Sequence, residues 1–270
     1  MKKIDKLGRA TLFIMAAITL AACGGGSDSS STENTNTETT PKSLNQAAYD
    51  GGTAYDFGFN SVPNIPFINA PEDTDFTRYA MLHDGTTYRL YFFKQNSDDT
   101  IYQFAYNSST QQYEYGFNSI PELNLTGMPE DADTSSFAML HDGTTYRLYL
   151  KRTGNATTIY QFSYNSATQN YEYALNSIPI LFITLAPADA NLDRWAMLHD
   201  GSVYRLYTGK SGEPDTLYQF SFNAASSDYE WGFNSISELQ VTNMPADSIK
   251  PNFTMLHDGS DYRFYYPSEK

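Results

Sequence analysis

Four histidines recur at a fixed interval and have the clearest capacity for chemistry. They are the only histidines in the chain, and each is followed by Asp-Gly: His83, His141, His199 and His257, spaced 58 residues apart. Imidazole is a common ligand of zinc, copper and nickel, so four copies facing one axis could hold a transition metal ion. The structural alternative is preferred: the histidine ends a strand, and Asp-Gly forms a two-residue turn in which both residues take positive φ. A catalytic His-Asp pair is disfavoured, because no serine or cysteine recurs beside it.

Aspartates recur in the loops that precede the histidine strands. Each loop holds a Pro-Glu-Asp or Pro-Ala-Asp sequence, and the four aspartates are Asp73, Asp131, Asp189 and Asp247. Closely spaced carboxylates suit calcium, which takes six to eight oxygen ligands. None of the loops has the spacing of an EF-hand, so solvated turn residues are the preferred interpretation. No cofactor is firmly predicted, and calcium and a transition metal stay open as alternatives.

Four arginines lie in the middle of aromatic-rich segments: Arg89, Arg147, Arg205 and Arg263. A buried arginine must be paired with an acid or stacked on a ring. Two sets of partners fit the repeat. The first set lies across the Asp-Gly turn: Asp84, Asp142, Asp200 and Asp258. The second set lies on the last strand of each repeat: Glu114, Glu172, Glu230 and Asp56. We expect a structural role for these arginines, with anion clamps on an exposed edge as the alternative.

A single ligand site must use residues that break the repeat. The candidates are Phe182 within the apolar run Ile180–Ile183, Arg194 beside Trp195, and Trp231, where other copies have tyrosine or phenylalanine. Exposed aromatic rings would suit stacking on sugars, although a role in filling the core is preferred for Trp231. The apolar run is the stronger partner site, because an exposed apolar patch usually marks an interface.

Repeated strings show which elements position these residues. AMLHDGTTYRLY occurs unchanged at 80–91 and 138–149 and in altered form at 196–207 and 254–265, and a second string follows it at 101–120, 159–178 and 217–236. Short aromatic runs bounded by turn residues predict strands, and a period of this length predicts a propeller, a solenoid or an array. Each repeat therefore has four strands. A short Leu-x-Leu or Leu-x-Val segment adds a further strand whose place in the sheet stays open.

The two ends of the repeat region are complementary. Residues 44–61 resemble the third and fourth strands, whereas the chain ends after the second strand of the last copy. Pairing the two ends removes free sheet edges, which a closed ring requires and an open solenoid does not. We expect an all-β fold, a four-bladed β-propeller of 58-residue, four-stranded repeats, with its last blade built from both ends. In architecture it resembles the hemopexin-type propellers. The alternative is a string of small β modules.

The N-terminus has the pattern of an export signal. Basic residues precede the apolar run Ala10–Leu20, which is shorter than the about 20 residues that span a bilayer. The run ends in Leu20-Ala21-Ala22-Cys23, which resembles the lipobox of bacterial lipoproteins. The resemblance implies a signal peptide at 1–22, a diacylglycerol on Cys23, and an outer-membrane anchor, because Gly24 follows the cysteine where Asp would favour the inner membrane. The composition of residues 23–43 predicts a disordered tether. Residues 44–270 are expected to form the folded domain.

Composition limits the classes of function. A net charge of −14 disfavours a nucleic-acid partner, and one cysteine rules out an internal disulfide framework. We expect a monomeric, lipid-anchored binding or scaffold module of the cell envelope, which recognises protein or glycan through its divergent loops. No catalytic residue is predicted. The alternatives are a metal or small-ligand carrier that uses an axial channel, and a hydrolase or lyase acting on polysaccharide. The sequence leaves the periplasmic or surface orientation open.

Overall fold

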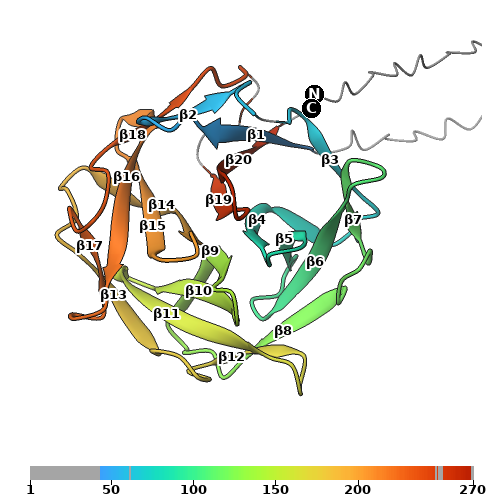
Figure 1. The fold of residues 1–270 in the computed structure, drawn as a ribbon. Helices are drawn as coiled ribbons and strands as arrows, with labels where there is room; N and C mark the ends of the chain where they lie inside the picture. Colours follow the sequence, from blue (N-terminus) through green and yellow to red (C-terminus); the bar gives the residue numbers. More distant parts are fainter. Residues whose placement is uncertain (1–42, 61, 247, 249–251, 269–270) are drawn as a thin grey trace, which may run out of the picture. The chain divides into compact units, whose positions relative to one another are not determined.

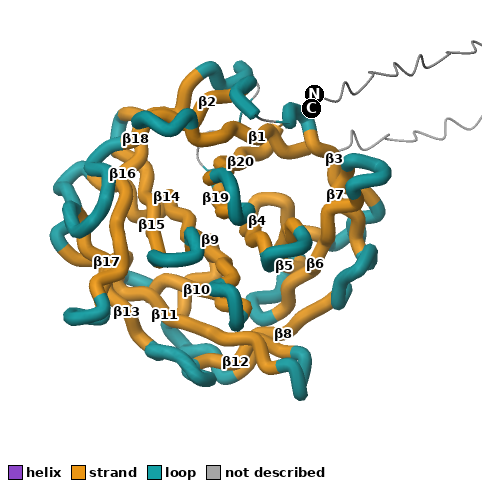
Figure 2. Tube along the Cα trace, in the orientation of Figure 1, coloured by secondary structure: helices purple, strands orange, loops and turns teal. Residues whose placement is uncertain are grey.

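The computed structural model describes residues 43–60, 62–246, 248 and 252–268, all of which lie within Thr40–Lys270. These residues form 20 strands, and all of the regular structure is β (Figure 2). The predicted signal peptide, Cys23 and Asp247 lie outside the described residues. Ser43, the last residue of the predicted tether, is the first residue of a strand. The described residues contain no helix with the length and hydrophobicity needed to span a bilayer.

The strands fall into four units of similar order. Unit I consists of β4 (Thr74–His83), β5 (Tyr88–Lys94), β6 (Thr100–Asn107), β7 (Gln112–Tyr115) and β8 (Glu122–Thr126). Unit II consists of β9 (Ala132–His141), β10 (Tyr146–Arg152), β11 (Asn155–Asn165), β12 (Asn170–Tyr173) and β13 (Ile180–Thr184). Unit III consists of β14 (Ala190–His199), β15 (Tyr204–Lys210), β16 (Glu213–Asn223), β17 (Asp228–Trp231) and β18 (Leu239–Thr242). Unit IV consists of β19 (Thr254–His257), β20 (Tyr262–Ser268), β1 (Ser43–Tyr49), β2 (Ala54–Phe57) and β3 (Ile65–Ile68).

Within each unit the first four strands pair antiparallel in order. In unit I, β4 pairs with β5, β5 with β6, and β6 with β7, which confirms the strand order expected from the repeat. The first strand begins at Thr74, earlier than the Ala80 start of the repeated string, and its register shifts between Asp75 and Tyr79. Tyr79–Leu82 are buried on both faces of the strand. Such two-sided burial occurs where a sheet is covered on both sides.

The short fifth strand has two partners. β8 pairs antiparallel with β6 of its own unit, through Thr100 and Asn124, and parallel with β12 of the next unit, through Asn124 and Asn170. The same double pairing recurs for β13, β18 and β3. The sequence left the place of this segment open. The pairing covers the outer edge of one unit with a strand from its neighbour, which leaves that edge protected from strand addition.

The two ends of the repeat region pair with each other as expected. β1 pairs antiparallel with β20 from Ser43–Ser268 to Ala48–Arg263, so unit IV combines strands from both ends. The first strands pack in a closed circle, β4 beside β9, β9 beside β14, β14 beside β19, and β19 beside β4 (Figure 1). All four first strands are therefore innermost.

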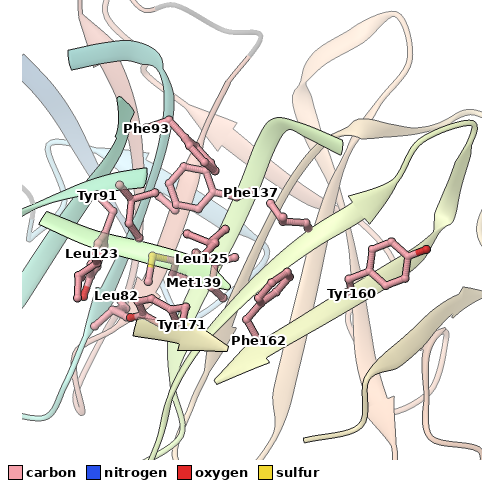
Figure 3. Close-up of a cluster of buried hydrophobic side chains, with 14 residues drawn as sticks. Leu82, Tyr91, Phe93, Leu123, Leu125, Phe137, Met139, Tyr160, Phe162 and Tyr171 are labelled. Carbon is pink, nitrogen blue, oxygen red and sulfur yellow. The ribbon is translucent and has the colours of Figure 1, made fainter. Parts of the chain in front are cut away.

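Four hydrophobic clusters lie between neighbouring units. The cluster between units I and II joins Tyr91 and Leu123 of one unit to Phe137, Phe162 and Tyr171 of the next (Figure 3). Equivalent clusters lie between the other three pairs of units. Complete burial of such a side chain contributes about 1.5–3 kcal/mol. The high tyrosine and phenylalanine content of the sequence therefore holds neighbouring units together.

The Asp-Gly turn differs from the expected two-residue form. His83 pairs with Tyr88, so the loop spans the four residues 84–87, and within it only Gly85 has a positive φ, of 91°. Asp84 Oδ1 accepts hydrogen bonds from the backbone N–H groups of Thr86, at 3.0 Å, and Thr87, at 2.8 Å. The two-residue prediction was wrong because the aspartate side chain caps a longer loop.

Candidate ligand pockets between neighbouring units

The four histidines converge on the axis of the circle of first strands. Together with leucine and methionine side chains they line one cavity of about 10 Å³, which is about the space that a single water needs. His83 packs against Tyr88 with 4.5 Å between ring centroids, and the other three histidines do the same with their tyrosines. Burial lowers the pKa of His83, His141 and His199.

Metal-ligand geometry is missing from the described part of the chain. In residues 43–60, 62–246, 248 and 252–268, histidine, cysteine, aspartate and glutamate form no group of three or more that could hold a metal ion. Three of the four predicted calcium ligands instead accept a hydrogen bond from a tyrosine hydroxyl of the third strand. The pairs are Asp73 with Tyr102 at 2.7 Å, Asp131 with Tyr160 at 2.7 Å, and Asp189 with Tyr218 at 2.9 Å. These carboxylates therefore stabilise their own units.

The four arginines pair with the aspartates across the turn. The Nε–Oδ2 distances are 2.7 Å for Arg89–Asp84, 2.7 Å for Arg147–Asp142, 2.9 Å for Arg205–Asp200 and 3.0 Å for Arg263–Asp258. This confirms the first of the two partner sets. The acids of the second set bond to other side chains. Glu114, for example, accepts hydrogen bonds from the Asn107 and Thr110 side chains. Burial alone would raise the pKa of Asp84, but hydrogen bonds from Thr86 and Arg89 outweigh it and hold the pKa far below its usual range.

The same aspartates also connect neighbouring units. A tyrosine at the start of the second strand donates its hydroxyl to the aspartate of the preceding unit. The pairs are Tyr146–Asp84 at 3.1 Å, Tyr204–Asp142 at 3.2 Å, Tyr262–Asp200 at 3.0 Å and Tyr88–Asp258 at 3.0 Å. Four equivalent links run around the whole circle. They fix the arginine of one unit against the tyrosine of the next.

A pocket lies beside each of these links, between neighbouring units. The I/II, II/III, III/IV and IV/I pockets have volumes of about 410, 260, 430 and 170 Å³. One unit contributes an arginine, a tyrosine, a glutamine and the loop after its fourth strand, and the next unit contributes three aromatic side chains. The aromatics on the third strand of the next unit, called here the rim aromatics, are Tyr164, Phe222, Tyr49 and Tyr106 in the same order of pockets.

Hydrogen bonds fix the polar wall of the I/II pocket. Arg89 Nη1 donates to Gln103 Oε1 at 3.3 Å and to the Asn118 carbonyl at 3.1 Å. Gln103 Nε2 donates to the Tyr91 hydroxyl at 2.7 Å, and its Oε1 accepts from the Ile120 N–H at 3.0 Å. The III/IV pocket repeats this network through Arg205, Gln219, Asn234, Tyr207 and Ile236. The loop after the fourth strand is thereby held in place.

The other two pockets depart from this pattern. In unit II the loop begins with Ala174 at a φ of 61°, where units I and III have Gly116 and Gly232. Phe222 replaces the rim tyrosine, whereas the bond from Arg147 Nη1 to Ser163 Oγ, at 3.2 Å, is shared with Arg205 and Ser221 of unit III. In the IV/I pocket, Nη2 of Arg263 is held by Asp261 at 3.0 Å. The four pockets are therefore equivalent in position and different in chemistry.

None of the four repeat-breaking candidates lines one of these pockets. Arg194 and Trp195 are only 7% and 4% exposed, and Trp195 Nε1 donates to Ser136 Oγ of unit II at 2.9 Å. Trp231 is half-buried, with Nε1 donating to the Ser237 carbonyl at 3.3 Å. Phe182 is 47% exposed on β13. The structure thus brings Arg194 and Trp195 into the interior and leaves Phe182 on the surface.

The pocket residues were missed because a single ligand site was expected among residues that break the repeat, whereas the pocket residues recur in it. The signal was present in the recurrence of arginine, Gln-Phe and Asn-Ser at the 58-residue period. What the sequence did not show is that these three elements meet the aromatics of the following unit.

The chain matches no protein-family profile and no curated protein sequence. Solved structures that match part of the chain include SapL1 lectin in complex with alpha methyl fucoside, at 13% identity and a TM-score of 0.33, over 72% of this chain and 56% of that chain. A mutant of Aleuria aurantia lectin in complex with alpha-methyl-L-fucoside has 11% identity and a TM-score of 0.37, over 82% and 68%. Kluyveromyces lactis Hsv2p has 13% identity and a TM-score of 0.27, over 66% and 49%. The chain therefore spans about half the length of several of these proteins. At such low identities and TM-scores, similarity transfers no ligand to this chain.

Proposed function

We propose that the chain is a lipid-anchored glycan-binding module of the bacterial cell envelope, built as a four-bladed β-propeller. The observation that carries the proposal is the set of four pockets between neighbouring units. Each combines an arginine, a glutamine and tyrosine hydroxyls with aromatic faces.

The propeller architecture is supported by the strand pairing. Four units of antiparallel strands place their first strands in a closed circle, and the last unit is completed by the pairing of β1 with β20. A propeller uses this arrangement to avoid free sheet edges. The clefts between its blades then occur once per repeat.

The chemistry of the I/II pocket favours a neutral, hydroxyl-rich ligand. The charge of Arg89 is offset by Asp84 at 2.7 Å, so the pocket offers directed hydrogen bonds without a net positive charge. The Tyr164 ring provides an apolar face, and the glutamine and phenol groups provide donors and acceptors.

Pocket size favours a saccharide unit over a protein partner. The I/II and III/IV pockets, at about 410 and 430 Å³, lie within the range of about 300–1,000 Å³ that is usual for small-molecule sites. Two such sites in one ring would act together on a surface that presents many copies of the ligand, since linked sites gain affinity through effective concentration. The axial cavity, at about 10 Å³, does not favour the carrier alternative.

The direction of β1 suits a membrane-anchored module. The strand runs from Ser43, where the predicted tether ends, to Tyr49, which lines the III/IV pocket. At 3.3 Å per residue these residues lie about 20 Å apart. The predicted anchor would thus join the strand end that is remote from the pocket.

A glycan array with the full chain tests the proposal. The key variant replaces the four rim aromatics with alanine: Tyr49→Ala, Tyr106→Ala, Tyr164→Ala and Phe222→Ala. We expect the native chain to bind defined glycans and the variant to lose binding at least tenfold while keeping its β-sheet circular dichroism. The control is Tyr115→Ala, a half-buried tyrosine outside the pockets. A native chain that binds nothing on the array contradicts the proposal.

A further inference from the structure

The four pockets fall into two pairs by the residues that line them. The I/II and III/IV pockets have the same residue type at every lining position. The II/III pocket differs from them by Phe222 in place of a tyrosine, and the IV/I pocket differs by Val62 and Ile65 in place of isoleucine and leucine. Because the units follow one another around a closed circle, the two matching pockets lie on opposite sides of the ring (Figure 1).

Pocket size separates the same two pairs. The matching I/II and III/IV pockets have volumes of about 410 and 430 Å³, whereas the II/III and IV/I pockets have about 260 and 170 Å³. Small-molecule sites usually have volumes of about 300–1,000 Å³. Of these four pockets, the matching pair therefore falls within the usual range and the other pair falls below it.

The loop after the fourth strand has one arrangement in units I and III. It begins with Gly116 or Gly232, at φ values of 76° and 80°, which glycine adopts without strain. The glutamine oxygen of the same unit accepts a hydrogen bond from the N–H of Ile120, at 3.0 Å, or of Ile236, at 2.9 Å. Both isoleucines are half-buried. The loop is thus held against the glutamine in the same way in both matching pockets.

The same loop is arranged differently in unit II. It begins with Ala174, and the Gln161 amide, oriented so that both of its ends are satisfied, donates to the Ile178 carbonyl at 2.9 Å and accepts from Arg147 Nη1 at 3.0 Å. Ile178 is 41% exposed. The loop backbone therefore presents a carbonyl to the glutamine where units I and III present an N–H.

The IV/I pocket departs from the matching pair in the charge around its arginine. Arg263 is paired with two carboxylates, Asp258 and Asp261, each at 3.0 Å. The position of Asp261 is taken by the uncharged Thr87 in unit I and Val203 in unit III. The arginine wall of the IV/I pocket therefore carries a negative charge that the matching pair lacks.

We propose that the I/II and III/IV pockets are the two ligand sites of this chain, that each takes one neutral sugar unit, and that the chain is a divalent binder. The inference rests on the proposed glycan-binding function. The II/III and IV/I pockets belong to the packing between units and take no ligand. Two equal sites on opposite sides of a ring can hold two separate glycan chains together, or bind one crowded glycan surface with enhanced affinity.

Saturation with single sugars tests the number of sites. The probes are the methyl glycosides of D-glucose, D-galactose, D-mannose, N-acetyl-D-glucosamine and L-fucose. Each is titrated by isothermal titration calorimetry into the full chain carrying Cys23→Ser, so that no lipid is attached, at protein concentrations near the Kd. We expect at least one probe to occupy two sites per chain with a single Kd. One, three or four sites per chain would overturn the inference.

Substitutions at two rim aromatics assign the sites. Tyr164→Ala removes an aromatic ring from the I/II pocket, and Tyr49→Ala removes one from the III/IV pocket. Each variant should keep one site with the native Kd, and that remaining site shows that the variant is folded. The double variant should bind no sugar, although its II/III and IV/I pockets are unaltered. Sugar binding by the double variant would place ligand in one of those two pockets and refute the assignment.

A graft into unit II should create a third site. Ala174→Gly, Leu175→Phe and Ile180→Glu give unit II the loop sequence of unit I, and Phe222→Tyr supplies the rim tyrosine of the matching pair. We expect three sites per chain, a gain that loss of folding cannot imitate. A graft that still binds two sugars would show that these four residues are not what closes the II/III pocket.

Divalent binding has a second readout in solution. Bovine serum albumin carrying many copies of the bound sugar should precipitate with the native chain, and excess methyl glycoside should dissolve the precipitate. The Tyr164→Ala variant should bind the same conjugate without precipitating it, because it has one site. Precipitation by this one-site variant would contradict a valence of two.

The results distinguish this inference from the proposed function. A chain that binds glycans on the array but none of the methyl glycosides would overturn the single-sugar sites and leave glycan binding in place. A negative array together with no binding of the methyl glycosides would remove the proposed function itself.

Discussion

Tyr146 donates its hydroxyl to Oδ2 of Asp84 at 3.1 Å, and the same oxygen accepts Nε of Arg89 at 2.7 Å. Asp84 and Arg89 belong to one unit, and Tyr146 belongs to the next. One carboxylate thus closes its own hairpin and joins two units. The arrangement occurs four times around the ring, beside each pocket.

The effects of substituting Arg89 and Asp84 on the free energy of unfolding should be strongly non-additive. We expect Arg89→Ala and Asp84→Ala each to destabilise the fold by about 2–4 kcal/mol, because each leaves a mostly buried charge without its partner. A double-mutant cycle should then give a coupling of about 1–3 kcal/mol. Chemical denaturation measures all three variants. The surface pair Arg78 and Asp98, in which Asp98 is 72% exposed, is the control and should couple by less than about 1 kcal/mol. Additive effects at Arg89 and Asp84 would refute the pairing.

The axial histidines should make the fold less stable in mild acid. Burial lowers the pKa of His83, His141 and His199 in the folded state, although the facing aspartates Asp84, Asp142, Asp200 and Asp258 partly oppose this. Below the unfolded value of about 6.5, the unfolded chain therefore binds more protons than the folded chain. The free energy of unfolding should fall as the pH falls from about 6.5 through the folded pKa values, by at most about 1.4 kcal/mol per pH unit for each histidine.

Urea denaturation between pH 8 and pH 5 measures this slope. A variant with all four histidines replaced by glutamine should have a flatter profile in that window. At lower pH, both proteins should lose stability again, because the pKa values of Asp84 and its equivalents are held low in the folded state. An unchanged slope in the glutamine variant would show that the histidines do not titrate in the folded core.

Two separate variants, Ala174→Gly and Gly116→Ala, should change the free energy of unfolding in opposite directions. Both residues have positive φ, at 61° and 76°, which costs a residue with a Cβ about 1–2 kcal/mol. We expect Ala174→Gly to stabilise the fold by about 0.5–1 kcal/mol, and Gly116→Ala to destabilise it by about 1 kcal/mol. A Cβ on Gly116 would meet no atom within 4 Å, so the cost is conformational rather than steric. Thermal melting checks both variants, and a neutral Gly116→Ala would contradict the assigned φ.

Removing the strands β1 and β2 should unfold or aggregate the protein. Deletion of residues 43–60 exposes the edge of β20 and removes Leu44, Ala47 and Tyr55 from two hydrophobic clusters. Size-exclusion chromatography and thermal melting measure the effect. Deletion of residues 24–40, which lie before the first strand, is the matched control and should leave the melting temperature within about 2 °C. A soluble chain with normal melting after the first deletion would disprove closure of the ring.

Cys23 should carry the predicted lipid. In a bacterial host supplied with labelled palmitate, the native chain should incorporate label and fractionate with membranes. Cys23→Ser should do neither, because the thiol is the only attachment point for the diacylglycerol. Ala22→Gly, which keeps a small residue before the cysteine, should retain labelling. Label in the Cys23→Ser protein would exclude lipidation at this residue.

The sequence alone was sufficient for the repeat, the strands and the pairing of the chain ends. These features depend on local pattern: alternating aromatic runs define strands, and a partial copy at each end defines the missing half. The Arg89–Asp84 pair was one of two pairings that the sequence left open, and the structure selects the one whose members lie five residues apart on one hairpin. The sequence left metal binding open as an alternative, because residue type does not show how many ligands reach one point.

The pockets were decided only by the tertiary structure. Arg89 and Tyr164 become neighbours because two units pack side by side, and no local pattern records that contact. Burial of Trp195 and exposure of Phe182 were equally undetermined, since either aromatic could fill a core or face solvent. Periodicity specifies what each unit is made of, whereas the packing between units determines which of its side chains meet and which a ligand can reach.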